Sequence, residues 1–132
     1  LLSEARLPLA ELRLLQGRLG EALREGRAAM VEVEVAEARL LEARAGHVVG
    51  RIHAALGSSR EGFAMIARAV TVARQIGAEV EEARALAAHA RLSKERGDAR
   101  ASWRSDLQRA YDIFTRMGAT LEAGRVRELL DS

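Results

Sequence analysis

The sequence predicts an all-α fold, a short right-handed solenoid of antiparallel helix hairpins followed by a C-terminal closing helix. Composition is the first indication, because the 132 residues are 48% hydrophobic and 30% charged, with one proline and 3% aromatics, which favours helix. The second is a period: Gly17, Gly57 and Gly97 are evenly spaced, and each separates two helical stretches. A fixed period of about 40 residues is typical of helical-repeat arrays. Alternation of apolar and polar residues occurs only over 31–35, which is too short for a sheet.

The first repeat is expected over about 3–36. Pro8 suits the first turn of a helix, where its missing N–H costs nothing, so a short helix should cover 8–16 and end at Gly17. A second helix is expected over 19–30, with Leu19, Leu23 and Met30 spaced for one face. The connecting turn should fall within 31–35. That stretch contains no glycine, however, so a helix that runs on into the next element stays open as the alternative.

The second and third repeats are expected over about 37–77 and 78–118. A helix over 36–56 should end at Gly57, and Ser58-Ser59 with Glu61 is close to a capping box for the helix that ends near Gly77. Helices then follow over 79–96 and up to Gly118, and Gly97-Asp98 supplies the same stop and cap. A closing helix should occupy about 119–131.

These seven helices, joined by short turns, should place sequential neighbours side by side and antiparallel. We expect residues 1–132 to form a single domain. Because the chain starts at Leu1 rather than Met, we expect this domain to have been cut from a longer protein.

Small residues recur where crossing helices would need to approach closely. They are Ala10, Gly17, Ala22 and Ala29 in the first repeat, Gly50, Gly57, Gly62 and Ala69 in the second, and Ala90, Gly97, Ser102 and Ala110 in the third. A second repeated mark is Gly77-Ala78 with Arg84, matched one repeat later by Gly118-Ala119 and Arg125.

Each hairpin therefore resembles a tetratricopeptide repeat (TPR), which implies a superhelix whose concave face is lined by the first helix of each hairpin. The chain departs from that family in its period of about 40 instead of 34. It also lacks the usual aromatic near the start of the first helix and the turn proline, and His53 stands where a tyrosine is common. Long repeats ending in Ile-Gly-Ala or Met-Gly-Ala resemble those of large bacterial ATP-dependent transcription regulators of the maltose-activator and LuxR types, and of related signalling ATPases. The closing runs 111–119 and 125–130 resemble the ends of such proteins.

Several functional classes are disfavoured. The chain contains no cysteine and no apolar run of membrane-spanning length, and its net charge is only +2 with few aromatics, so we expect no thiolate site, no membrane span and no nucleic-acid partner. The three histidines, His47, His53 and His89, have no i,i+4 pairing that would indicate zinc. We expect neither metal nor cofactor, and no enzyme activity.

One basic face does indicate binding. No acid occurs from 43 to 60, and Arg44, His47 and Arg51 share one helical face. A similar basic face recurs one repeat later in Arg84, Arg91 and Lys94. These six residues are the candidate partner-binding groove, which would favour an acidic peptide or a C-terminal carboxylate. The alternatives are a solvated arginine face and ion pairs to glutamates of the preceding hairpin. In the first repeat the matching positions carry Glu4, Leu7, Glu11 and Leu14, so the basic face would end there.

The functional expectation is a non-catalytic protein–protein interaction or sensor module of a cytoplasmic bacterial signalling or transcription regulator. The alternative is a self-association module, a homodimer that brings attached effector domains together.

Overall fold

The computed structural model describes residues 19–132, with the backbone alone for most of residues 19–30. The expected helix over 8–16, the turn at Gly17 and the first-repeat positions Glu4, Leu7, Ala10, Glu11 and Leu14 lie outside the described residues. Nothing is described of the side chains of Ala22 and Ala29.

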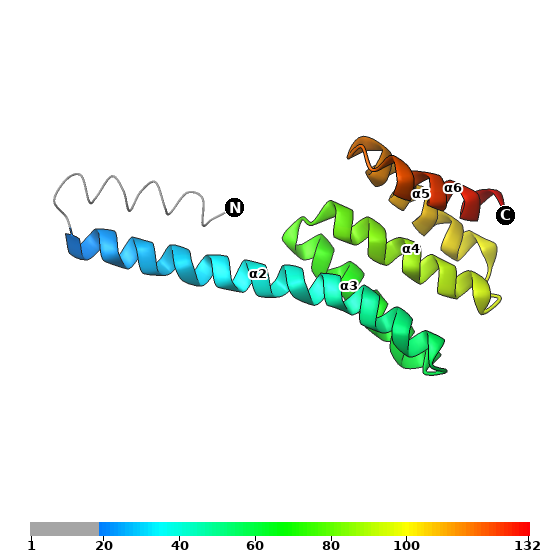
Figure 1. Cartoon of the computed structure of the whole chain (residues 1–132), viewed down its shortest axis with the longest axis horizontal. Coiled ribbons are helices and arrows are strands. Elements are labelled where there is room, and N and C mark those ends of the chain that lie inside the picture. The colour runs from blue at the N-terminus through cyan, green and yellow to red at the C-terminus, as the bar shows by residue number, and fades with distance from the viewer. Residues whose placement is uncertain (1–18) are drawn as a thin grey trace. The chain divides into compact units, whose positions relative to one another are not determined.

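Five helices make up the described part of the chain (Figure 1): α2 (Leu19–Ala55), α3 (Ser59–Ile76), α4 (Glu79–Glu95), α5 (Arg100–Arg116) and α6 (Thr120–Asp131). Residues 19–132 contain no strand, which confirms the all-α class for this part. None of these helices combines the length and the apolarity needed to cross a membrane.

Helix α2 continues through the expected turn at 31–35. The turn was the wrong alternative, and the helix that runs on was the right one, because no glycine or proline interrupts this stretch. The chain divides into two compact units, residues 1–38 and 39–132. All contacts described below lie within the second unit.

Glycines close the helices of this second unit. Gly57, Gly77, Gly97 and Gly118 have φ values of 96°, 72°, 80° and 75°, a left-handed conformation that a side chain disfavours. This confirms the predicted turns at Gly57 and Gly97. The predicted cap at Asp98 is wrong. Ala99 is the N-cap of α5, because the Asp98 carboxylate instead accepts a hydrogen bond from Ser93 Oγ at 2.7 Å.

Helices α4, α5 and α6 each pack against the helix that precedes them in the chain (Figure 1). The core that they share with α3 contains apolar side chains from all four helices, with Leu86, Leu107, Ile113, Phe114 and Val126 among the most buried. The connecting turns are short, so the order of these helices along the chain is also their order in the packing.

Close approach of α2 and α3 depends on two glycines. A Cβ at Gly62 would lie 2.3 Å from the Gly50 carbonyl oxygen, and a Cβ at Gly50 would lie 2.6 Å from Ile66 Cγ1. The predicted small-residue contact of the second repeat is therefore confirmed. Its third-repeat counterpart, Ser102, is exposed and bonds to the Ala99 carbonyl oxygen at 2.7 Å. That prediction was wrong, because the neighbouring Trp103 is buried in place of a small residue.

Glu82 joins three helices. Its carboxylate is buried on α4 and accepts hydrogen bonds from Arg74 Nε on α3 at 3.1 Å and from Arg109 Nε on α5 at 2.6 Å. Burial by itself raises the pKa of Glu82, but the bonds from Arg109 and Arg74 outweigh it and hold the pKa below its usual value. The ionised Glu82 carboxylate therefore links α4 to α3 and α5 through hydrogen bonds, an arrangement that we call the Glu82 crosslink.

Candidate functional site

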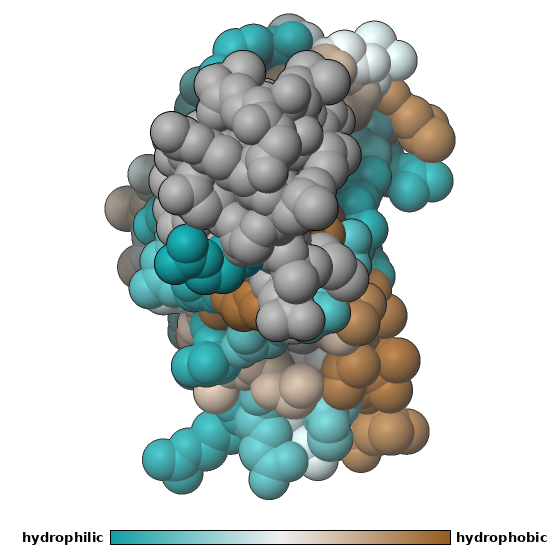
Figure 2. All heavy atoms as spheres, turned by 90° about the vertical axis from the view of Figure 1, so that its left-hand side faces the viewer, coloured by the Kyte–Doolittle hydropathy of each residue, from teal (hydrophilic) through white to brown (hydrophobic). Residues whose placement is uncertain are grey.

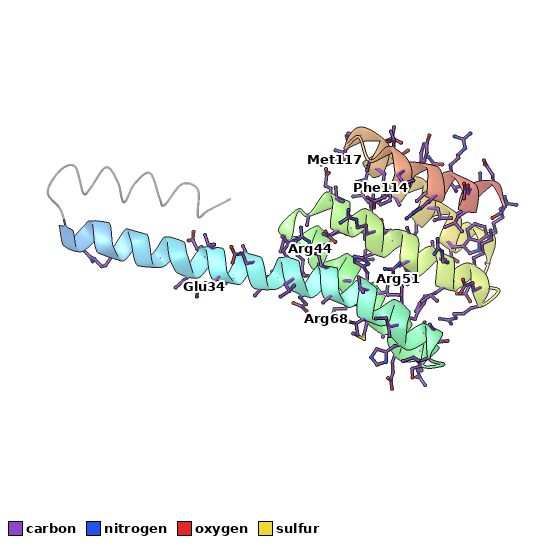
Figure 3. The ribbon with its side chains drawn as sticks, in the orientation of Figure 1. Glu34, Arg44, Arg51, Arg68, Phe114 and Met117 are labelled. Atoms are coloured by element: carbon purple, nitrogen blue, oxygen red, sulfur yellow. The ribbon has the colours of Figure 1, made fainter. Side chains whose placement is uncertain are left out.

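A cavity of about 590 Å³ opens along the side chains of α2, α4 and α6. Arg44 and Arg51 project into it from the side of α2 that faces α4 (Figure 3). Helix α5 adds only Phe114. The lining residues are Arg44, His47, Val48 and Arg51 from α2, Glu81, Arg84, Ala87, Ala88 and Arg91 from α4, Phe114, and Leu121, Glu122, Arg125, Val126 and Leu129 from α6.

Five of the six predicted groove residues meet in this cavity, namely Arg44, His47, Arg51, Arg84 and Arg91. Lys94 does not line it. Its amine donates to the Leu129 carbonyl oxygen at 3.3 Å and to Ser132 Oγ, and lies 5.1 Å from the centre of the Trp103 ring. The Lys94 amine is therefore hydrogen-bonded at the C-terminal end of α6 and does not face the cavity.

Two of the arginines are held by glutamates. Arg44 Nε donates to Glu81 Oε1 at 2.9 Å, and Arg84 donates to Glu122 through Nε at 3.0 Å and Nη2 at 3.2 Å. Arg84 Nη1 also reaches Glu81 Oε1 at 3.0 Å. The hydrogen bond from Arg84 lowers the pKa of Glu122. Ion pairs to glutamates of the preceding hairpin, one of the alternatives to a binding groove, do not form for these two arginines. Each pairs instead with a glutamate two helices further along the chain, in the first turn of α4 or of α6.

The other three arginines of the cavity are Arg51, Arg91 and Arg125. Among the described residues none of these three arginines has an ion pair or a side-chain hydrogen bond. Five arginines against two glutamates give the cavity three positive charges in excess. Guanidinium groups without a partner are suited to bidentate binding of carboxylates.

His47 lies at the buried side of the cavity. Its Nε2 atom is 3.4 Å from Glu81 Oε2, an oxygen that is itself buried and has no hydrogen-bond partner among the described residues. Burial lowers the pKa of His47, although the Glu81 charge opposes this shift. The imidazole is therefore neutral near pH 7 and adds no charge to the cavity.

The lining also has an apolar part, formed by Val48, Ala87, Phe114, Leu121, Val126 and Leu129. Phe114 and Val126 are buried, whereas Leu121 is 69% exposed. A ligand that fits here would combine negative charge with apolar groups.

Sequence reasoning missed Glu81, Glu122, Leu121 and Arg125 as members of the site. The repeated Gly-Ala mark contained a signal for three of them. Arg125 occupies the same place after Gly118-Ala119 as Arg84 does after Gly77-Ala78, and Glu81 and Glu122 hold the same place after that dipeptide. Only the packing of α5 against α4 and of α6 against α5 brings these repeated positions to one cavity.

The other histidines lie elsewhere. His89 packs against Phe63 with ring centres 4.0 Å apart and ring planes tilted by 37°, and its Nδ1 is 3.6 Å from Asp106 Oδ2. In the part of the chain that the structure describes, no cluster of three or more acidic or histidine side chains is placed to hold a metal ion.

No family model and no curated protein matches the chain.

Proposed function

We propose that the unit of residues 39–132 is a non-catalytic protein–protein interaction module, and that it binds an acidic segment of a partner in the cavity between α2, α4 and α6. The observation that carries this proposal is the group of Arg51, Arg91 and Arg125, three arginines without partners among the described residues around one cavity. The apolar lining beside them favours a partner segment with hydrophobic as well as acidic side chains.

We further propose that the hairpins stack as a TPR-like solenoid closed by α6. The Gly50–Gly62 contact supports this, as does the recurrence of a left-handed glycine at Gly77 and, one repeat later, at Gly118. By the resemblance of its long repeats, the module would belong to a cytoplasmic bacterial signalling or transcription regulator.

A designed peptide tests the binding proposal. The probe is a short fluorescent helix of repeated Leu-Glu-Glu-Leu, and the same peptide with glutamine for glutamate is its control. We expect the acidic probe to bind more tightly than the glutamine version, and its affinity to fall with salt because screening weakens charge attraction.

Matched variants of the chain test whether the probe binds in the cavity. Arg51→Ala with Arg91→Ala should weaken binding of the acidic probe, whereas Arg60→Ala with Arg68→Ala removes two exposed arginines outside the cavity and should not. Equal loss in both double variants would show that the probe responds only to net charge and would contradict the proposal.

One observation favours the second candidate function, self-association. Helix α2 carries an exposed apolar face of Leu41, Ala45, Val48, Val49, Ile52 and Leu56, and Figure 2 shows hydrophobic side chains gathered toward the lower right of that view. The spacing of this face is symmetric about the bond between 48 and 49. A second copy running antiparallel would therefore set Leu41 against the partner's Leu56, as a two-fold interface requires.

Light scattering over a concentration series tests this second candidate. A dimer that forms through α2 should dissociate in Ile52→Glu and persist in Met117→Glu, which changes an equally exposed apolar side chain in a turn away from α2. A monomer at all concentrations would exclude self-association through this face.

A further inference from the structure

We propose that the outward face of α6 binds a partner helix that carries a glutamate or aspartate in its first turn, and that Arg125 holds this carboxylate. The inference extends the proposed function, since it also treats the module as one that binds protein segments. It names a surface that adjoins the cavity, with which it shares Leu121 and Arg125, and the chemistry of its partner.

The first observation is a ladder of ion pairs from helix to helix. Arg44 of α2 pairs with Glu81 in the first turn of α4, and Arg84 of α4 pairs with Glu122 in the first turn of α6. The two arginines are one repeat apart along the chain, and so are the two glutamates. Each ion pair, or rung, therefore joins an arginine to the first turn of the next helix in the series α2, α4, α6.

Arg125 is the next arginine of this ladder. It occupies the place on α6 that Arg84 occupies on α4, and it is exposed, with no ion pair or side-chain hydrogen bond to any described residue. A third ion pair of this ladder would join Arg125 to a carboxylate. A partner helix would supply that carboxylate.

The second observation is that the rest of the same face is also open. On α4, the residues around Arg84 are covered: Ala83 is fully buried, and Val80 and Ala87 are packed against the core. Their counterparts on α6, one repeat later, are Leu121, Gly124 and Glu128, and all three are exposed. Nothing lies within 4 Å of a Cβ placed on Gly124. A glycine there allows another backbone to come close, as Gly50 and Gly62 do between α2 and α3.

A second copy of this chain fits the face poorly. One repeat before Glu81 the chain carries Leu41, so α2 of another copy would present a leucine where the ladder needs a carboxylate. In α4 and α6 of a folded copy, Glu81 and Glu122 are already paired with that copy's own Arg44 and Arg84. The occupant is therefore an acidic amphipathic helix of a partner protein.

A helical peptide copied from residues 119–132 is the probe, because it already carries Glu122 at the position that pairs with an arginine. Its exposed residues 127 and 131 can be joined by a lactam after Arg127→Lys, so that it stays helical in solution. We expect fluorescence anisotropy to detect binding to the full chain at a peptide concentration below about 1 mM. The Glu122→Gln peptide should bind about fivefold more weakly.

Charge reversal identifies the residue that binds. The chain with Arg125→Glu should lose the Glu122 peptide and regain binding with the Glu122→Arg peptide. Absence of binding by the parent peptide, or failure of this exchange, would overturn the inference. If the peptide replaced the chain's own α6, its affinity would depend on Arg84 and not on Arg125, which would overturn it equally.

Gly124→Leu separates this surface from the cavity, because Gly124 does not line the cavity. This variant should block the α6 peptide and leave the Leu-Glu probe of the cavity unaffected. The double change Arg51→Ala with Arg91→Ala should have the opposite selectivity. Each variant should therefore lose binding of only one of the two peptides. The two measurements distinguish failure of the α6 surface from failure of the cavity proposed above.

Discussion

Gly50 and Gly62 set the distance between α2 and α3, because each lies against the backbone or side chains of the opposite helix. A glycine inside a helix costs about 1 kcal/mol relative to alanine. It is retained here because the space that an alanine methyl would need is already filled.

Alanine substitution tests this reading in two chemically identical changes. Gly62→Ala should lower the free energy of unfolding by about 1–3 kcal/mol, because its Cβ would overlap the Gly50 carbonyl oxygen. Gly124→Ala places the same methyl in open space on α6 and should stabilise by up to about 1 kcal/mol. Urea denaturation of both variants measures the difference, and stabilisation by both would contradict close packing at Gly62.

Two of the three glutamates in the first turn of α4, Glu79 and Glu82, give a second matched pair. Glu82 is buried and accepts hydrogen bonds from α3 and α5, whereas Glu79 is 40% exposed and pairs only with Arg116 among the described residues. Glu82→Ala should cost about 2 kcal/mol, since charge-assisted bonds are lost, and Glu79→Ala less than about 1 kcal/mol. Equal midpoints of urea unfolding for the two variants would refute the crosslink.

Stability should also depend on pH through His47, which is buried, and His89, which is half-buried. Burial lowers the pKa values of His47 and His89 below 6.5 in the folded chain. Below about pH 7 the unfolded chain therefore binds more protons than the folded one, and acid favours unfolding. The pKa values of Glu82 and Glu122 are lowered from 4.5, so their contribution is lost only at more acidic pH.

Urea midpoints at pH 7.5 and 5.5 measure the histidine effect. We expect the midpoint to fall over this range, and to fall less when His47→Gln and His89→Gln are combined. A parent chain whose midpoint is the same at both pH values would contradict the burial of these rings.

At the scale of the helices, the helix ends marked by glycine could be predicted from the sequence. Gly57, Gly77, Gly97 and Gly118 each require a left-handed turn, so the boundaries of α3 to α6 follow from sequence. The turn at 31–35 could not be decided, because alternating valine and glutamate is compatible with helix once the neighbouring turns of α2 are formed. Contacts between side chains of different helices could not be predicted from the sequence either. Lys94 matched the helical spacing of the groove residues, but its amine is hydrogen-bonded to the end of α6.

A proline tests the continuity of α2. Glu34→Pro should disrupt the helix at about 3 kcal/mol or more of local free energy, and helicity by circular dichroism should fall by several residues. Ala99→Pro is the control, since its φ of −56° already suits proline. Unchanged helicity in Glu34→Pro would mean that a turn exists at 31–35 after all.

At the scale of the whole unit of residues 39–132, the five arginines of the cavity fall into two groups. Arg44 and Arg84 are held by the glutamates of the ladder and stabilise the packing, whereas Arg51, Arg91 and Arg125 have no such partners among the described residues and surround the cavity. The sequence predicted most of the basic lining from its repeat, and it could not tell which arginines would be neutralised. That distinction depends on contacts between residues a full repeat apart in the chain.

Side-chain NMR of the arginine Nε–H groups tests the binding cavity most directly. Titration with the Leu-Glu helical probe should shift the signals of Arg51, Arg91 and Arg125, while those of Arg60, Arg68 and Arg100 stay in place. The glutamine version of the probe should cause no such shifts. Equal shifts across all six arginines, or shifts confined to the second group, would contradict an acidic-segment site between α2, α4 and α6.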